Sequence, residues 1–378
     1  SARSRTQFQT IASKLDLGGD LLLVANTDAI VDQFMAAAIS SEAGVPAEDP
    51  NEREIRETLE RFHKFLNRNG FSALQGVGLS LSPREDDQHA LELFVSRDYV
   101  DSNLPLWRGM VGWHPRRLLS LDFIPGNAVM ARAGTPELAS LWGVLRSAVD
   151  EVAPEPTQKR FDEWHRALNE ALGMELETLV KSLRDEALVA VQLSDTEKSV
   201  MPTKNGFVTI PAPSFLIVVG TNDDMLRGMI EAQFAKHKIT LTETQVGDIV
   251  MRSTVNKLPS LIPLQPAYAS QAGFFLFGST PDIVAEALLA YRHKNGLLAR
   301  PKFRTAFQGL SMVNNGIIYV SPKMGEVLGS VSDANMKEAM ASTGKHPATA
   351  RMLRQLMTHG GRGQSCALTI QNWKKGVM

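Results

Sequence analysis

The chain has 378 residues, of which 43% are hydrophobic and 21% are charged, and its formal net charge is −1 from 40 basic and 41 acidic side chains. This composition is typical of a folded globular protein and unlike that of a disordered chain. A net charge near zero gives no field that would hold a polyanion, so we expect no nucleic-acid partner. The length exceeds one typical domain and indicates two or three modules, each with a core of its own.

No apolar run reaches the roughly 18 residues that a membrane-spanning helix needs, so we expect no transmembrane segment. The chain begins at Ser1 rather than at methionine, and we therefore expect that a leader or an anchor preceded it.

The single cysteine, Cys366, excludes an internal disulfide and a cysteine-rich zinc site. It is compatible with a reducing cytosol and equally with an exported protein that lacks disulfides.

The first part of the chain predicts a strand over 20–25, a helix over 28–38 and a second helix over 52–69. The second helix has apolar residues at helical spacing and is stopped by Gly70. Two alternating segments follow, around 77–81 and 91–95, and indicate an antiparallel hairpin with one face in water.

The stretch Leu106 to Arg117 (LWRGMVGWHPRR) is predicted to be a loop, and it holds the strongest candidate binding residues in the chain. Tryptophan and arginine dominate interface energetics when a partner desolvates them. Two interpretations stay open: the aromatic residues are buried in an internal interface, or they are exposed and bind a partner. The candidate residues are Trp107, Arg108, Trp113, His114, Arg116 and Arg117.

A second block repeats the order of the first. It predicts a strand over 128–133, a helix over 137–150 and a long helical region over 161–183 that is broken near Gly173. Two strands then follow, over 187–193 and 215–219. The segment 194–213 between them carries three prolines and is expected to be a mobile excursion or a lid.

The segment from Pro213 to Tyr291 shows the clearest structural pattern. An apolar strand leads into an amphipathic helix over 223–236, and a hairpin follows whose tight turn uses Gly247. A second strand, 274–277, runs into Thr280 and Pro281, a hydroxyl cap and a proline that start a helix.

The remaining segment predicts a strand over 317–320, helices between 323 and 359, and a strand over 365–372. This third block lacks a last strand. Because an open strand edge favours aggregation, we expect its strand to pair within the molecule.

The strand, hydroxyl and proline junction at Thr280 recurs at Thr135-Pro136 and Ser321-Pro322, which favours internal duplication. The alternative is chance, because any α/β chain contains strand-to-helix junctions. We therefore predict an α+β fold of duplicated β-α-α-β-β modules, with mixed or mainly antiparallel sheets and helices on one face. The modules are expected over 1–122, 123–313 and 314–378, the last one truncated and packed on the others.

No residue pattern predicts catalysis, a metal or a cofactor. None of the eight histidines has a partner at the helical i, i+4 spacing of a metal pair, and His165 is interpreted as a half-exposed helix residue. Cys366 is expected to be a buried, unreactive strand thiol. No Gly-x-Ser-x-Gly elbow occurs, and the glycines at 360–363 match no phosphate-binding spacing.

A resemblance covers most of the segment from Phe123 to Val320. The succession IPGNAVMARAGTPEL, APSFLIVVGTNDDMLRGMIEAQF, GDIVMRS and AYASQAGFFLFGSTPDIVAEALL resembles an exported bacterial family of unknown function. The resemblance implies a periplasmic or secreted protein built from duplicated strand-helix modules. It supplies no functional residues.

Three functions remain open. The first is a non-enzymatic extracytoplasmic binding or scaffold protein with an unknown protein or envelope partner. The second is a carrier that holds an apolar ligand between helices and sheet, since 15 methionines can pack adaptably. The third is a hydrolase whose site is assembled from distant residues. A deep apolar cavity would favour the carrier, convergent titratable residues the enzyme, and an exposed aromatic patch the scaffold.

Overall fold

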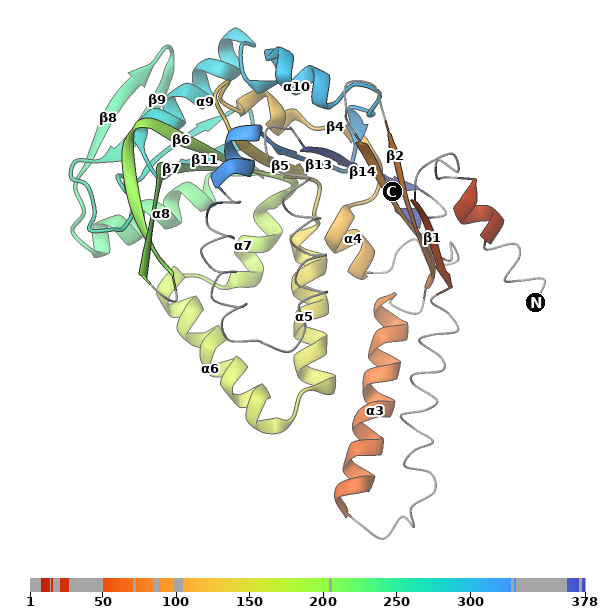
Figure 1. Ribbon diagram of the computed structural model, residues 1–378. Coiled ribbons are helices and arrows are strands. Elements are labelled where there is room, and N and C mark those ends of the chain that lie inside the picture. The colour runs from red at the N-terminus through yellow and green to blue at the C-terminus, as the bar shows by residue number, and fades with distance from the viewer. Residues whose placement is uncertain are drawn as a thin grey trace. The chain divides into compact units, whose positions relative to one another are not determined.

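The structure is a computed structural model, and it describes residues 8–13, 15, 21–26, 50–70, 73–83, 89–97, 105–203, 206–327, 330, 366–373 and 376–377 (Figure 1). The predicted helix over 28–38, most of the region between 323 and 359, and the glycines at 360–363 lie outside these residues. The chain divides into two compact units. The first comprises Ser1–Pro115, Pro136–Lys181 and Ile370–Met378, and the second comprises Arg116–Thr135 and Ser182–Thr369.

These units do not follow the module boundaries predicted at 122 and 313, because strand pairing joins segments that are distant in sequence. Strand β5 (Met130–Gly134) pairs with β13 (Gly316–Val320), with Met130 opposite Val320. Residues of the predicted second and third modules therefore share one sheet. At the other end, β16 (Gly376–Val377) pairs with β3 (His89–Arg97), which attaches the C-terminal residues to the first unit.

The first unit contains a five-stranded antiparallel sheet in the order β1-β2-β3-β16-β15. The hairpin predicted from the alternating segments is present as β2 (Leu74–Pro83) and β3, and β1 (Leu21–Asn26) and β15 (Asn372–Trp373) complete the sheet. Ile11 lies directly over β2, so that a Cβ at Gly76 or Gly78 would collide with its side chain. The two glycines therefore allow close packing of the N-terminal helical residues on the sheet.

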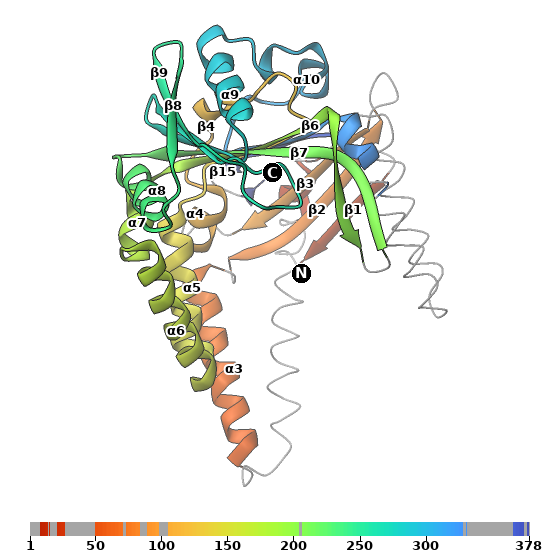
Figure 2. The same ribbon diagram turned by 90° about the vertical axis from the view of Figure 1, so that its left-hand side faces the viewer.

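Three helices of the first unit contribute to a small apolar cluster of Phe65, Leu106 and Val144. Figure 2 shows α3 (Pro50–Asn69), α5 (Leu138–Val152) and α6 (Glu155–Leu172) as coiled ribbons. Helix α6 ends at Gly173, which adopts a left-handed conformation with φ 72°, so the break predicted near this residue is confirmed. The helices are α3 (Pro50–Asn69), α4 (Pro105–Val111), α5 (Leu138–Val152), α6 (Glu155–Leu172) and α7 (Leu176–Ser182).

The second unit contains a nine-stranded sheet in the order β14-β13-β5-β6-β7-β11-β10-β9-β8. Every strand register that the described residues define is antiparallel, and the predicted α+β class with antiparallel sheets is confirmed. The strands not yet given are β6 (Leu183–Thr203), β7 (Gly206–Thr221), β8 (Leu241–Val246), β9 (Ile249–Thr254), β10 (Ala267–Gln271), β11 (Phe274–Gly278) and β14 (Cys366–Ile370). A two-stranded ladder of β4 (Arg116–Arg117) and β12 (Val313–Asn314) lies in the same unit.

The segment 194–213, predicted to be a loop, is instead largely strand. After a register shift between Leu193 and Lys198, β6 and β7 continue to pair from Lys198 opposite Pro211 to Thr203 opposite Gly206. The prolines misled the prediction because they were read as loop residues. Proline is tolerated in a strand wherever its missing N–H is not needed by a neighbouring strand, and this end of the hairpin pairs only with itself.

One face of the nine-stranded sheet forms the main core. Leu188, Leu216 and Leu276 lie on this face and are almost completely buried. The next residues along two of these strands, Val189 and Ile217, point to the other face and are each 43% exposed. The buried face is covered by α9 (Pro281–His293) together with η1 (Leu119–Phe123), η2 (Leu297–Ala299) and α10 (Pro301–Ala306). Figures 1 and 2 show α9 and α10 on the same side of the sheet.

The junction predicted to start α9 is confirmed. The Thr280 hydroxyl accepts a hydrogen bond from the Ile283 N–H at 3.5 Å, and Pro281 occupies the first turn.

The first two predicted blocks have the same strand order. In each block, three strands that are consecutive in sequence are neighbours in the sheet, β1-β2-β3 in the first and β5-β6-β7 in the second. Because antiparallel meanders are common, this match does not establish duplication, which stays a prediction. The expected internal pairing of the third block is confirmed by β13 and β5.

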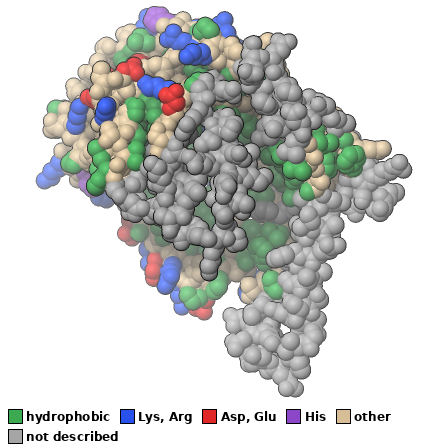
Figure 3. Space-filling model, viewed as in Figure 1, with side chains coloured by type: hydrophobic (Ala, Val, Ile, Leu, Met, Phe, Trp, Pro, Cys, Tyr) green, Lys and Arg blue, Asp and Glu red, His purple; other side chains and the backbone are tan. Residues whose placement is uncertain are grey.

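Charge is unevenly distributed over the second unit, although the chain as a whole is nearly neutral. Exposed basic residues follow one another from the end of α9 through α10. Figure 3 shows Lys and Arg side chains gathered at the top of the view, where Figure 1 places α9 and α10. Asp248 and Asp122 pair with two of them. The basic residues are Arg292, Lys294, Arg300, Lys302 and Arg304.

Tyr268 makes the second unit sensitive to high pH. The residue is 1% exposed, and its hydroxyl donates to Glu231 Oε1 at 3.2 Å. Burial, followed by the Glu231 charge, raises the pKa of Tyr268 to about 12. Since the unfolded value is about 10, the folded state favours the neutral phenol, and its contribution to stability is complete below pH ~10 and lost as the pH rises to ~12.

We therefore expect the native protein to lose about 1–2 kcal/mol more unfolding free energy over that range than Tyr268→Phe loses. Urea denaturation of both proteins at several pH values measures the difference, because lysine deprotonation affects both alike. Parallel pH profiles would contradict the prediction.

Candidate functional site

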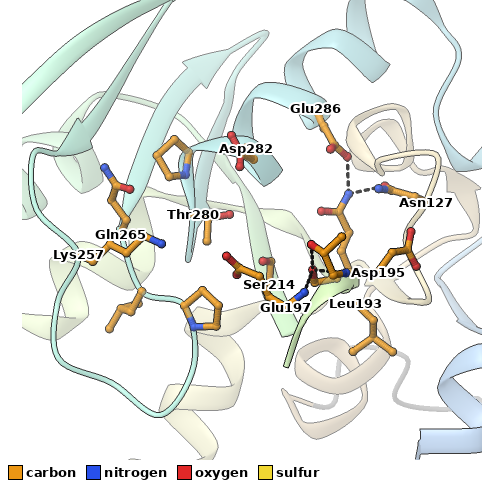
Figure 4. A pocket seen from close by; sticks show the side chains of 16 residues that line it. Asn127, Leu193, Asp195, Glu197, Ser214, Lys257, Gln265, Thr280, Asp282 and Glu286 are labelled. Atoms are coloured by element: carbon orange, nitrogen blue, oxygen red, sulfur yellow. Dashed lines mark hydrogen bonds between the residues drawn. The ribbon is translucent and has the colours of Figure 1, made fainter. Parts of the chain in front are cut away.

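A cavity of about 400 Å³ lies within the second unit. Five segments supply its walls: Asn127 before β5, residues 192–197 of β6, Ser214 of β7, the segment that precedes β10, and the start of α9. Figure 4 shows Glu286 and Asn127 at one side of it and Lys257 and Gln265 at the other. The lining residues are Asn127, Gln192, Leu193, Ser194, Asp195, Thr196, Glu197, Ser214, Lys257, Pro263, Leu264, Gln265, Thr280, Pro281, Asp282 and Glu286.

Two glutamine side chains are held in fixed orientations in the cavity wall. Gln192 is 8% exposed, and its amide nitrogen donates to Glu286 Oε2 at 2.6 Å and to the side-chain oxygen of Asn127. Gln265 donates from its amide nitrogen to the Thr254 carbonyl at 2.8 Å. Because these amide nitrogens are engaged by the protein, the amide oxygens remain as acceptors of defined position.

An irregularity in β6 places two acidic residues, Asp195 and Glu197, in the lining of the cavity. The register between β6 and β7 breaks between Leu193 and Lys198, and the intervening residues leave the ladder. Ser194 stabilises the turn, since its hydroxyl oxygen accepts from the backbone N–H groups of Thr196 at 3.2 Å and Glu197 at 2.9 Å. Asp195 and Glu197 are exposed as a result.

The cavity is acidic. Four carboxylates line it, from Asp195, Glu197, Asp282 and Glu286, against the single amine of Lys257. One carboxylate has a partner outside the lining, because Lys323 Nζ lies 2.6 Å from Asp195 Oδ1. This hydrogen bond, together with the charge of Lys323, lowers the pKa of Asp195 from its ordinary value. The remaining carboxylates leave the lining with an excess of negative charge.

The lining residues, all of which the structure describes, offer hydroxyls and carboxylates as their reactive groups. Neither histidine nor cysteine is among them. The Ser194 hydroxyl accepts from the turn, and the Thr280 hydroxyl caps α9. The arrangement can therefore orient and bind a polar molecule.

The stretch Leu106 to Arg117 differs from the predicted loop, since Pro105–Val111 is the helix α4. The Trp107 indole donates to the Gly70 carbonyl at 2.7 Å, and Arg108 donates to Glu137 Oε1 at 2.5 Å. The guanidinium of Arg108 also lies 4.4 Å from the centre of the Trp113 ring. Trp107 and Arg108 therefore make internal contacts within the first unit.

The other four candidates are exposed. Trp113 is 39% exposed and lies beside His114, with ring centres 6.1 Å apart. Arg116 donates to the Asp185 carbonyl at 2.9 Å, and Arg117 lies 3.7 Å from Asp122. The division between the units falls after Pro115, so four of the six candidates belong to the first unit and two, Arg116 and Arg117, belong to the second.

Cys366 lies in a strand, as predicted, but it is exposed rather than buried. Its strand, β14, is at the end of the nine-stranded sheet, where a side chain has fewer neighbours.

Comparison of the chain with family models, with curated proteins and with solved structures finds no match. Among the residues that the structure describes, no helix combines the length and the apolar character needed to cross a bilayer. The resemblance to an exported family stays a prediction, and function has to be argued from the geometry of the chain itself.

Proposed function

We propose that this protein is a non-enzymatic binding protein and that the cavity of the second unit takes a small polar ligand with positive charge. One observation supports the proposal most: four carboxylates and two oriented amide groups converge on a cavity whose lining has a single amine. Cavities of this size suit small molecules, and a few placed polar groups determine which of them bind.

The chemistry of the lining favours an amine or a guanidine as the ligand. Carboxylate oxygens form short, charge-assisted hydrogen bonds with such cations, about twice as strong as neutral ones. Asp282 and Glu286 are exposed residues of the lining, and their carboxylates would attract a cation from solvent. An apolar ligand finds little support here, because only a minority of the lining side chains are apolar.

The proposed location is extracytoplasmic, either periplasmic or secreted, and it rests on the resemblance stated above. A protein or envelope partner is part of the same proposal, since a binding protein of this kind would pass its ligand or its signal to another component.

The test is calorimetric titration of the full chain with spermidine and, for comparison, with citrate. We expect saturable binding of spermidine and none of citrate. Asp282→Asn is expected to weaken spermidine binding by about tenfold, the equivalent of one charge-assisted hydrogen bond of ~1.4 kcal/mol.

Asp224→Asn is the matched control. Asp224 precedes α8 (Met225–Lys236) as Asp282 begins α9, so both substitutions remove a carboxylate from a helix N-terminus, but Asp224 does not line the cavity. Equal loss in the two variants, or equal binding of citrate and spermidine, would refute the proposed site.

A further inference from the structure

Three potential metal ligands converge in the first unit, and none of them is among the residues that line the cavity of the second unit. They are His165 of α6, Glu175 in the turn that follows it, and Glu177 in the first turn of α7. Each offers one ligand atom, and these atoms all lie within 4.8 Å of one another. Imidazole nitrogen and carboxylate oxygen are the donors that divalent transition metals take in proteins.

The turn after α6 creates this arrangement. Gly173 ends the helix in a left-handed conformation, and its N–H bonds to the Asn169 carbonyl at 2.8 Å. The Asn169 side chain then fixes the segment that follows the turn. Its Oδ1 accepts from the Leu176 N–H at 2.9 Å, and its Nδ2 donates to the Glu175 carboxylate. Residues ten and twelve positions after His165 are thereby brought back to its ring.

The distance between two of the ligand atoms suits a tetrahedral ion. His165 Nε2 lies 3.3 Å from Glu177 Oε2. For bonds of about 2.0–2.1 Å, a tetrahedral zinc ion holds two ligand atoms about 3.3–3.4 Å apart. The nitrogen and the oxygen therefore already have the separation they would have as neighbours around one ion.

His165 Nε2 is buried and forms no hydrogen bond of good geometry with any described residue. The histidine side chain is 14% exposed, and the ring packs 5.3 Å from that of Trp142. The Glu177 carboxylate faces this nitrogen at 3.3 Å, and an ion held between the two atoms would give both a partner.

The neighbouring side chains orient the carboxylates as supporting residues do in metal sites. Trp142 Nε1 donates to Glu177 Oε1 at 3.0 Å, which leaves Oε2 directed to His165. Asn169 fixes Glu175 in the same manner. Hydrogen bonds of this kind set the direction of ligand atoms and raise metal affinity.

We propose that His165, Glu175 and Glu177 bind one divalent transition-metal ion of the zinc type, with water as the fourth ligand. Three protein ligands of mixed nitrogen and oxygen type with an open position are typical of zinc. Magnesium and calcium are less suited, because they prefer six or more oxygen ligands. Glu177 is 37% exposed, so an ion can reach the site from solvent.

The experiment is equilibrium dialysis of the chelator-treated full chain against Zn²⁺, with Co²⁺ absorption as a spectroscopic readout. We expect one equivalent of Zn²⁺ to bind and Co²⁺ to give the intense visible bands of a tetrahedral site. Glu177→Gln retains an oxygen for Trp142 and should fold normally, but its affinity for Zn²⁺ should fall on the order of 100-fold.

Glu170→Gln is the matched control, since Glu170 is exposed on the same helix and is outside the cluster. His165→Gln is measured in parallel, with melting temperatures, so that the result does not depend on the folding of one variant. Failure of the native chain to bind a stoichiometric equivalent of Zn²⁺ would overturn the proposal. Equal affinities of the cluster variants and the control, or tighter binding of Mg²⁺ than of Zn²⁺, would overturn it as well.

Discussion

Replacement of Phe123 by alanine is expected to lower the free energy of unfolding of the second unit by about 4 kcal/mol. The side chain is fully buried at the end of η1, where its ring stacks on Tyr291 at 4.5 Å with an angle of 6° and packs against Phe274 at 5.5 Å. Removal of a buried phenyl ring loses its transfer free energy and leaves a cavity that the neighbours fill only in part, which together cost about 3–5 kcal/mol.

Urea denaturation followed by circular dichroism measures this loss. Leu119→Ala is the control, because Leu119 lies in the same short helix but is 54% exposed, and its substitution should change stability by no more than about 0.5 kcal/mol. A loss below ~1 kcal/mol for Phe123→Ala would show that η1 does not close the core.

The elements that the sequence predicts well are those defined by local signals. The apolar segment before Thr221 is part of β7, and the segment FFLFG is β11. The Thr280 and Pro281 pair starts α9 as predicted, because both residues act on the helix terminus that they adjoin. Gly173 likewise marks the end of α6 through its own backbone conformation.

Two glycines lie in the stretch that was predicted to be a loop and contains α4. Gly109 is helical, and a Cβ there would lie 2.6 Å from a side-chain atom of Leu141. It is small because α5 approaches it closely. Gly112 has φ 70° and its N–H bonds to the Arg108 carbonyl at 2.9 Å, so it ends the helix in the usual way. The close packing of α5 on Gly109 is not visible in the sequence, and it is what distinguishes this helical glycine from a loop glycine.

Neither site could be read from residue spacing. Gln192 reaches Asn127 across 65 positions and Glu286 across 94, and such pairs are set by strand order. His165, Glu175 and Glu177 are closer in sequence, but a helical i, i+4 template does not detect them, because a turn rather than a helix brings them together. The predicted break at Gly173 was the available signal, since a chain reversal there places the following residues beside α6.

A second large effect is expected at Glu186, which is 4% exposed in the irregular part of β6. Its Oε1 accepts from the backbone N–H of the fully buried Ser120 at 2.6 Å, and its Oε2 lies 3.5 Å from Arg116 Nη2. The register shift between Leu183 and Ala187 turns this carboxylate toward η1. Arg116, a candidate binding residue from the sequence, therefore has a structural role in the second unit.

Glu186→Ala is expected to destabilise the second unit by about 3 kcal/mol. It leaves the Ser120 N–H buried without an acceptor, at a cost of ~1–3 kcal/mol, and removes the buried partner of Arg116. Glu186→Gln keeps an oxygen for Ser120 and should lose only about 1 kcal/mol, so the difference between the two variants isolates the acceptor from the charge. Urea denaturation of both variants gives that difference. If alanine and glutamine destabilise equally, the charge pair with Arg116 dominates, and the buried hydrogen bond to Ser120 is not what holds η1 against β6.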